Sequence, residues 1–288
     1  MSTFGRASIN GSTRLIAIVG DPVGHSLSPA LHNAAFAHLG LNMAYVPLPV
    51  PASHLPEAMA GLRALGFLGA NITVPHKTAV VPLLDELRGD AQTLRAVNTI
   101  VAEGERLVGF NTDAEGFTRA FLEAVPPGHA GGTALLLGAG GAARAAALGA
   151  LRLGFSHFIL VNRTRAAAES LAALVAELSG GTSCEVVPLR DLSAGHVRSA
   201  ALVINATTLG MHGQSKVPGA LADNVGVDQI VYDLVYAEGP TELTARARRQ
   251  GSRVVEGLAM LVHQAGAAFQ LWTGVPAPLD IMKHVLTG

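Results

Sequence analysis

Cysteine and charge are both scarce in this chain. Of its 288 residues one is Cys and 14% are charged, and 20 Lys and Arg against 21 Asp and Glu leave a net charge of −1. The lone Cys184 cannot close an intramolecular disulfide or build a cysteine zinc site, which indicates a reducing compartment. The balanced charge indicates no strong attraction to nucleic acid or to a membrane surface. We therefore expect a cytoplasmic protein with a small-molecule ligand.

One charge-free run is long enough to be tested as a membrane span. Residues 257–279 contain no Asp, Glu, Lys or Arg. However, His263, Gln264 and Gln270 interrupt the run, and its large apolar residues recur at helical spacing, which predicts a buried helix instead. The polar segment before Leu15 lacks the apolar core of a secretory signal, so we expect no export.

Lysine is the rarer cation. Only Lys77, Lys216 and Lys283 are Lys among the 20 positively charged residues, so 17 are Arg. Because Arg serves elsewhere for positive charge, a Lys marks a position where an ammonium group that can exchange a proton is useful.

Short apolar runs alternate with helical patterns, which predicts an α/β fold with parallel strands. The first series runs strand, helix, strand, helix, strand over residues 15–20, 29–39, 43–47, 53–65 and 69–73. Residues 97–102 and 106–111 flank a Glu-Gly-Glu turn and predict a hairpin that closes this sheet. A helix is predicted over 113–125, and the Pro- and Gly-rich segment 126–132 ends the series.

A second series begins after that segment. Its strands are predicted at 133–137, 157–161, 184–188, 202–205, 229–233 and 253–255, with a helix over 142–153. This pattern is typical of a doubly wound Rossmann-type sheet. No strand follows the helix that begins at Gly257, so we expect the last helices to return to the first domain. The predicted architecture is α/β with two domains, one with a mostly parallel sheet over 1–112 and 257–288, the other Rossmann-type over 113–256.

A glycine-rich loop follows the first strand of the second series and opens a helix. Its residues are Gly138, Ala139, Gly140, Gly141 and Ala142. Glycines let the backbone turn sharply and approach a pyrophosphate, whose charge is favoured by the amide groups at a helix N-terminus. The context indicates a dinucleotide site, although an ordinary Gly-rich turn stays open at this point.

The end of the next strand indicates which dinucleotide binds. NAD sites place Asp or Glu there for the ribose hydroxyls, whereas this chain has no carboxylate before Glu169. The residues at that position are Asn162, Arg163, Thr164 and Arg165. A guanidinium group and a hydroxyl suit the 2′-phosphate of NADP. The alternative is that Thr164 caps the following helix and that both arginines are only solvated.

Polar residues also gather where the strands of the first domain end. Ser26 and Ser28 follow the first strand, and two hydroxyls at alternate positions suit a carboxylate. Further polar residues at strand ends are Asn71, Thr73, Lys77, Asn98, Asn111, Thr112 and Asp113. Ligands of open sheets bind at the carboxyl ends of the strands, so we expect a polar site there. Each residue also has a local interpretation, with Ser28 and Asp113 as helix caps and Asn98 as a turn residue.

Eight motifs occur in order along the chain. They are Ser-x-Ser-Pro, Asn-x-Thr-x-Pro-x-Lys, Val-Asn-Thr, Gly-x-Asn-Thr-Asp, Gly-Ala-Gly-Gly-Ala, Asn-Arg-Thr, Asn-Ala-Thr-x-x-Gly-Met and Gly-Leu-x-Met-Leu-x-x-Gln-Ala. Together they closely resemble the shikimate dehydrogenase family over nearly the whole chain. The resemblance implies an NADPH-dependent reduction of 3-dehydroshikimate to shikimate in aromatic amino-acid (chorismate) biosynthesis.

The resemblance also implies roles for individual residues. Ser26 and Ser28 would hold the substrate carboxylate, and Lys77 would be the catalytic group. The residues expected at the substrate's hydroxyls and ring face are Thr73, Asn98, Asp113, Tyr236 and Gln264, with Asn71 facing the same way as Thr73. The residues expected at the cofactor are Gly138 to Ala142 and Asn162 to Arg165, with Asn205, Thr207, Leu234 and Gly257 along the nicotinamide. After Tyr236 the family often has Asn-Pro, where this chain has Ala237 and Glu238.

The expected reaction needs a proton donor and a positive neighbour at the ketone oxygen, because hydride delivery builds negative charge there. Lys77 supplies both, and we treat it as coupled to Asp113, which would orient the ammonium and bind a hydroxyl. Two alternatives stay open: a quinate/shikimate dehydrogenase that uses NAD(P), and a non-catalytic NADP-binding regulator of the same fold. We expect no metal, and a homodimer is compatible with the sequence but no pattern requires it.

Overall fold

The computed structural model describes residues 9–211, 216–236 and 239–287, so Ala237 and Glu238 lie outside the described residues. Its chain divides into two compact units, unit 1 with Met1–Thr112 and Leu261–Gly288 and unit 2 with Asp113–Met260. The boundary lies inside a helix, four residues after the predicted position at Gly257. Gly257 itself packs closely against Leu234 of unit 2, which explains the difference. Within the described ranges no helix has the length and apolar character needed to cross a bilayer.

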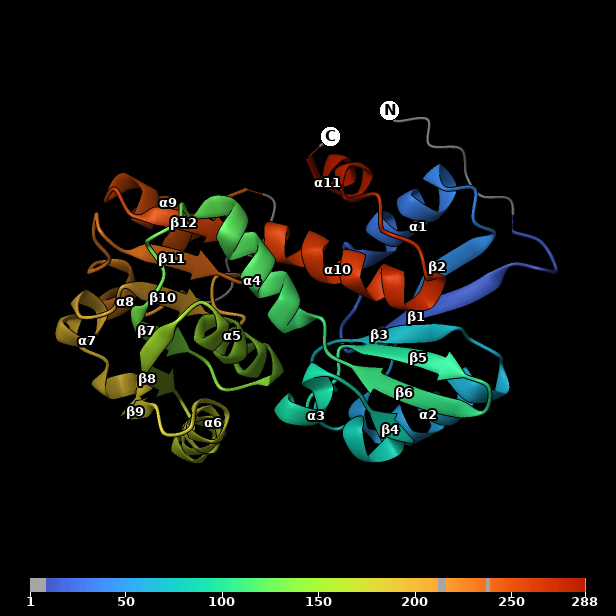
Figure 1. Cartoon of the computed structure of the whole chain (residues 1–288), viewed down its shortest axis with the longest axis horizontal. Coiled ribbons are helices and arrows are strands. Elements are labelled where there is room, and N and C mark those ends of the chain that lie inside the picture. The colour runs from blue at the N-terminus through green and yellow to red at the C-terminus, as the bar shows by residue number, and fades with distance from the viewer. Residues whose placement is uncertain (1–8, 212–215, 237–238, 288) are drawn as a thin grey trace. The chain divides into compact units, whose positions relative to one another are not determined.

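Unit 1 contains a six-stranded sheet in the order β2-β1-β3-β5-β6-β4 (Figure 1). The strands are β1 (Arg14–Gly20), β2 (Met43–Pro49), β3 (Gly69–Ile72), β4 (Glu86–Leu87), β5 (Thr99–Glu103) and β6 (Arg106–Phe110). β1 pairs in parallel with β2 and β3, and β4 in parallel with β6, whereas β5 is antiparallel to both of its neighbours. The predicted hairpin is therefore present as β5 and β6, but it does not close the sheet, because β4 lies beyond it.

Helices cover both faces of this sheet. They are α1 (Ser28–His38), η1 (Ala52–His54), α2 (Leu55–Ala64), η2 (Val81–Leu83), α3 (Asp90–Leu94), the later part of α10 (Gly257–Thr273) and α11 (Leu279–Thr287). On one face Met59 and Leu62 of α2 pack into a core with Ala17 and Ile72. On the other, Trp272 of α10 donates from Nε1 to the carbonyl of Ile100 at 2.8 Å. The last helices thus return to the first unit, as the sequence predicts.

Unit 2 is a Rossmann-type sheet of six parallel strands in the order β12-β11-β10-β7-β8-β9. The strands are β7 (Gly132–Leu137), β8 (Phe155–Asn162), β9 (Ser183–Pro188), β10 (Leu202–Asn205), β11 (Ile230–Asp233) and β12 (Arg253–Glu256). Numbered along the chain this is the order 6-5-4-1-2-3, which reverses direction between β7 and β10 and places a ligand crevice at their carboxyl ends. The predicted fold class is confirmed.

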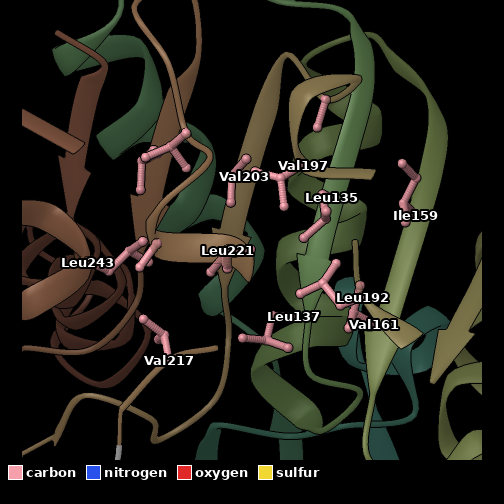
Figure 2. Packing of buried hydrophobic residues seen from close by; sticks show 14 of the residues in the cluster. Leu135, Leu137, Ile159, Val161, Leu192, Val197, Val203, Val217, Leu221 and Leu243 are labelled. Atoms are coloured by element: carbon pink, nitrogen blue, oxygen red, sulfur yellow. The ribbon is translucent and has the colours of Figure 1, made fainter. Parts of the chain in front are cut away.

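The helices of unit 2 bury its strands. They are α4 (Asp113–Ala124), α5 (Gly141–Arg152), α6 (Arg165–Ser179), η3 (Leu189–Asp191), α7 (Ala194–Arg198), α8 (Gly219–Ala222) and α9 (Glu242–Arg249). Leu135, Val203 and Ile159 of the sheet belong to one apolar cluster with Val197 and Leu243 from these helices, and Figure 2 shows members of this cluster. Alternate strand residues thus form a continuous apolar core, and the polar residues lie where the strands end.

One polar side chain in unit 1 is buried without a partner. His32 of α1 is fully buried, and neither of its ring nitrogens has a hydrogen-bond partner among the described residues. Its ring stacks on Tyr45 at 4.5 Å and lies near Phe269 and Trp272. Burial in this aromatic cluster lowers the pKa of His32 to about 3.

This histidine makes the stability of the protein depend on pH. As the pH falls below 6.5 the unfolded chain protonates His32 but the folded chain does not until about pH 3, so stability is lost over that range. We expect that lowering the pH from 7 to 5 costs the wild type about 2 kcal/mol more free energy of unfolding than it costs His32→Phe. Urea unfolding at the two pH values measures the difference.

The exposed His38 on the same helix provides the control. His38→Gln should keep the pH dependence of the wild type. Equal pH dependence in His32→Phe and the wild type would contradict the assignment of a neutral, buried His32.

Candidate active site

The strand ends of unit 1 bring its polar residues to one edge of the sheet. β1 and β3 are parallel, so the loops after both begin at the same edge. β5 runs the opposite way with Thr99 opposite Asn71, and Phe110 of β6 lies opposite Thr99. The start of β5 and the end of β6 therefore lie at that edge too, which collects the loops that carry Ser26, Thr73, Lys77, Asn98 and Thr112.

Ser28 is the first residue of α1 and is buried, at 4% exposure. Leu27 occupies the N-cap position and no side chain caps the helix, so capping does not account for Ser28. The Ser28 amide donates to the Ser26 hydroxyl at 3.3 Å, which places the two hydroxyl-bearing residues together. Two serines at the N-terminus of an 11-residue helix without acidic residues in its first turn suit a carboxylate.

Buried amides hold this edge together. Asn98 Nδ2 donates to Thr112 Oγ1 at 2.9 Å and to Gln264 Oε1 at 3.3 Å, and Asn98 Oδ1 accepts the Thr112 amide at 2.8 Å. Asn98 and Gln264 are thus brought together as predicted residues of one site. The contact to Gln264 is the longer of the two, and is the one that a ligand hydroxyl would most easily replace.

The side chain of Asn71 is hydrogen-bonded to other residues of the protein. Its Nδ2 donates to the carbonyl of Asn98 at 2.9 Å and to Thr99 Oγ1 at 3.1 Å, and its Oδ1 accepts the Tyr45 hydroxyl at 2.6 Å. Both amide hydrogens are therefore used within the protein, and the Asn71 side chain joins β3 to β2 and β5. Its expected contact with substrate stays a prediction.

The loop after β3 carries Thr73 and Lys77. The Thr73 amide donates to the Val19 carbonyl at 2.9 Å, and the Lys77 carbonyl accepts the Val97 amide at 2.7 Å. The buried His76 binds the Val50 carbonyl through Nε2 at 2.6 Å, which is a structural role. One end of the loop is thus fixed to β1 and the other to the segment before β5, and the half-buried Lys77 side chain projects from a backbone held at both ends.

The glycine-rich loop of unit 2 fits a phosphate group. Gly138 has φ +113°, and a Cβ there would lie 3.0 Å from Ala206 O and from Thr207, so only glycine fits. Gly140 is the N-cap residue of the 12-residue α5, with no side-chain cap and no acidic residue in the first turn. No side chain competes for the amide groups there, and a Cβ at Gly140 would meet nothing within 4 Å. This cradle suits a pyrophosphate.

The two arginines that follow β8 differ in their contacts. Thr164 occupies the N-cap position of α6, but its side chain makes no capping hydrogen bond, so the capping alternative is not what the structure shows. Arg165 binds Glu169 at 2.8 Å one turn on. Arg163 is exposed and makes no hydrogen bond or ion pair with the described residues, and Asn162 shapes the turn by donating to the Thr164 carbonyl. Arg163 is the arginine most available to a phosphate.

Asn205 and Thr207 meet after β10, where sequence reasoning places the nicotinamide. Asn205 Oδ1 accepts the Thr207 hydroxyl at 2.7 Å, and Asn205 Nδ2 donates to Asp233 at 2.9 Å. Leu234 donates its amide to the Asn205 carbonyl, and Gly257 leaves no room for a Cβ against the Leu234 carbonyl. Sequence reasoning missed the fully buried Asp233. Its only signal is a carboxylate at the end of an otherwise apolar strand.

Asp113 and Tyr236 are the predicted substrate residues of unit 2. Asp113 is the first residue of α4, is 4% exposed, and directly follows Thr112 in the chain. Burial, and then the negative charge of Asp113, raise the pKa of Tyr236, so its hydroxyl keeps its proton. Lys77 belongs to unit 1 and Asp113 to unit 2, and their coupling stays a prediction. Within the described residues no three His, Cys, Asp or Glu lie together as a metal site requires.

Comparison with known proteins decides the family. A model of the shikimate dehydrogenase substrate-binding domain matches residues 18–100, and one of the shikimate 5′-dehydrogenase C-terminal domain matches 257–287. The shikimate dehydrogenase (NADP+) of Moorella thermoacetica is 46% identical over 279 residues, which cover 96% of this chain and 94% of that protein. The chain belongs to the shikimate dehydrogenase family.

Two solved structures of related enzymes have the same fold. Shikimate 5-dehydrogenase from Thermus thermophilus, in complex with NADP(H) and shikimate, is 35% identical with a TM-score of 0.81, covering 95% of this chain and 98% of that one. Quinate dehydrogenase from Corynebacterium glutamicum, in complex with NAD, is 31% identical with a TM-score of 0.86, covering 96% and 99%. The predicted family is confirmed, and within this likeness the site residues must distinguish the substrates.

The lack of a side chain at Gly20 allows the loop after β3 to pack against the end of β1. A Cβ on Gly20 would overlap Thr73 Cγ2 and lie 3.0 Å from the Val74 carbonyl. We expect Gly20→Ala to displace the loop that carries Thr73 and Lys77 and to weaken shikimate binding about 10-fold, since overpacking typically costs about 1–3 kcal/mol. Isothermal titration with shikimate and with NADP+ measures the two affinities, and only the first should change.

Gly61→Ala in α2 is the matched control, because a Cβ at Gly61 meets nothing within 4 Å. It should leave both affinities unchanged. Wild-type shikimate affinity in Gly20→Ala would show that the close approach of Gly20 and Thr73 does not shape the site.

Proposed function

We propose that the chain catalyses the reversible, NADPH-dependent reduction of 3-dehydroshikimate to shikimate, a step of aromatic amino-acid biosynthesis. The observation that carries the proposal is the single edge of unit 1 that collects the loops with Ser26, Lys77 and Asn98, together with a phosphate cradle in unit 2. Shikimate has one carboxylate and several hydroxyls, which is the chemistry those side chains recognise. A homodimer is no part of the proposal.

The residues of unit 2 fit NADP. The uncapped N-terminus of α5 and the φ +113° backbone at Gly138 suit the pyrophosphate, and the exposed Arg163 with the free Thr164 hydroxyl suits the 2′-phosphate. Thr207 and Leu234 would border the nicotinamide. When bound, the cofactor supplies the hydride for reduction and accepts it in oxidation.

The residues of unit 1 bind and orient the substrate. Ser26 and Ser28 hold the carboxylate at the N-terminus of α1, where the helix dipole favours negative charge. Thr73 and Gln264 bind ring hydroxyls, as does Asn98 by exchanging its 3.3 Å contact with Gln264 for one with substrate. Because Asn98 is also bonded to Thr112, the hydroxyls meet a fixed surface.

Lys77 moves the proton. As negative charge builds on the ketone oxygen, the ammonium of Lys77 stabilises it and transfers a proton from Nζ, so the ketone becomes a hydroxyl group. In the reverse direction the neutral amine takes the proton back. Asp113 accepts a hydrogen bond from a substrate hydroxyl and orients the ammonium, and the Tyr236 hydroxyl, which stays protonated, is a donor beside that carboxylate.

The reaction is tested by following NADPH absorbance with shikimate and with quinate, each with NADP+ and NAD+. We expect the highest kcat/KM for shikimate with NADP+. In Lys77→Met, kcat should fall about 10²- to 10⁴-fold, the usual contribution of general acid–base catalysis, while the KM for shikimate changes little.

Lys216→Met, at an exposed position in unit 2, is the control and should keep wild-type kcat. A preference for quinate would favour the quinate dehydrogenase alternative, and no absorbance change with any pair would favour the non-catalytic regulator. Retained turnover in Lys77→Met would refute the role of Lys77.

Arg163 should determine the preference for NADP. Its guanidinium is not paired within the described residues, whereas that of Arg165 binds Glu169. Removing a hydrogen bond to a charged group typically costs about 1.5–3 kcal/mol, so Arg163→Ala should weaken NADPH binding about 10- to 100-fold and leave NADH binding unchanged. Fluorescence titration with both nucleotides measures the ratio.

Arg165→Ala is the matched control and should change the ratio less, because that side chain is already committed to Glu169. An unchanged NADPH/NADH preference in Arg163→Ala would remove Arg163 from the phosphate site.

A further inference from the structure

Asp233 is a fully buried carboxylate that the proposed reaction leaves unused. It ends β11 and accepts three hydrogen bonds, from Asn205 Nδ2 at 2.9 Å, from the Val235 amide at 3.1 Å and from the Thr241 hydroxyl at 2.6 Å. None of the ion pairs among the described residues includes it. A buried charge held only by neutral donors is costly, so its position calls for a reason.

The two carboxylate oxygens have separate tasks. Oδ1 accepts from Asn205, the last residue of β10, and from the Val235 amide in the loop after β11. Among the residues that the structure describes, Oδ2 accepts only from Thr241, the N-cap residue of α9. Oδ1 therefore binds the segments assigned to the nicotinamide, and Oδ2 binds the N-terminus of α9.

The Oδ1 branch continues to the phosphate loop. With its nitrogen directed at Asp233, the amide of Asn205 presents Oδ1 to the Thr207 hydroxyl at 2.7 Å and to the Thr207 amide at 3.2 Å. Thr207 Oγ1 then accepts the Leu209 amide at 3.1 Å, which fixes the turn. Thr207 in turn packs where a Cβ on Gly138 would lie, so the branch runs from Asp233 to the first glycine of the cradle.

The Asn205 Nδ2 and Val235 amide groups can only donate, so Oδ1 must accept, whereas the Thr241 hydroxyl at Oδ2 can donate or accept. Burial, as the largest cause, raises the pKa of Asp233 above its ordinary value, and the hydrogen bonds from Thr241, Val235 and Asn205 oppose that shift without reversing it. An amide of the same shape carries no charge, so its oxygen would accept the Asn205 and Val235 hydrogen bonds more weakly than the carboxylate does. Replacing Asp by Asn therefore changes the hydrogen bonding without changing the volume.

We propose that Asp233 is a positioning residue for the nicotinamide half of NADP, acting through Asn205 and Thr207. The proposal rests on the proposed function, because it assigns those loops to the nicotinamide. Through Oδ1 the carboxylate sets the direction of the Asn205 amide and fixes the segments that carry Thr207 and Leu234. The adenosine half would bind at α5 and the loop after β8. The hydrogen bonds that start at Asp233 reach that region only where Thr207 packs against Gly138.

The test compares two ligands that share the adenosine half. Adenosine 2′,5′-bisphosphate lacks the nicotinamide, and isothermal titration gives its Kd and that of NADP+ for the wild type and Asp233→Asn. We expect the Kd of NADP+ to rise about 10-fold, as expected for a weakened charged hydrogen bond, while that of the bisphosphate stays within about twofold. At saturating ligands kcat should fall about 10- to 100-fold, because small misplacement of a reacting group is costly.

Thr241→Val is the matched control. It removes a hydrogen bond from the same carboxylate, but on the Oδ2 branch, and it also removes the N-cap of α9. It should lower the Tm and leave the ratio of the two Kd values at the wild-type level. If Asp233→Asn does not fold, Asn205→Ala breaks the same branch one step further on and should show the same ratio change.

Two results would overturn the proposal: equal weakening of both ligands, which shows a merely structural role, or an unchanged ratio in a folded Asp233→Asn. The same altered ratio in Thr241→Val would also count against it. Failure of the proposed function is distinguishable, since the wild type itself would then fail to reduce NADP+ with shikimate.

Discussion

Burial of both faces of each sheet is the constraint on which the rest of the structure depends, because it leaves the ends of the strands as the place for polar groups. In unit 1 the core with Met59 lies on one face and the aromatic cluster with His32 on the other. Strand interiors must then be apolar, which accounts for a chain with only 14% charged residues. Since neighbouring parallel strands end at the same edge, the polar side chains that follow them meet without interrupting the core.

Buried amides make those edges rigid. Asn71, Asn98 and Asn205 each donate and accept from one side chain, so each satisfies both kinds of backbone or hydroxyl group where loops meet. A neutral amide also costs less to bury than a charge. Asp233 is a buried carboxylate among these groups, and its three donors explain why a carboxylate is tolerated there. The loops that carry the site are therefore held by networks rather than by apolar packing.

The long elements could be predicted from the sequence because their length gives the hydrophobic period room to repeat. β4 and the short helices α7 and α8 have two to five residues, too few to show a period. At the site, sequence position shows which residues follow a strand, but not what each side chain binds. Ser28, Asn71 and Thr164 illustrate this, since the structure removes a capping role from the first and third and gives the second a structural one.

In the proposed reaction Lys77 transfers a proton from a flexible side chain, and the segment before β5 fixes the backbone that carries it. The Val97 amide donates to the Lys77 carbonyl at 2.7 Å, and the next residue, Asn98, accepts the Ile72 amide at 2.8 Å and donates to Phe110 at 3.1 Å. The segment therefore links the backbone of Lys77 to that of Asn98, whose side chain belongs to the amide cluster. Arginine could hold charge there but could not release a proton near neutral pH. In a chain that uses Arg for most of its positive charge, the Lys at position 77 is best explained by proton exchange.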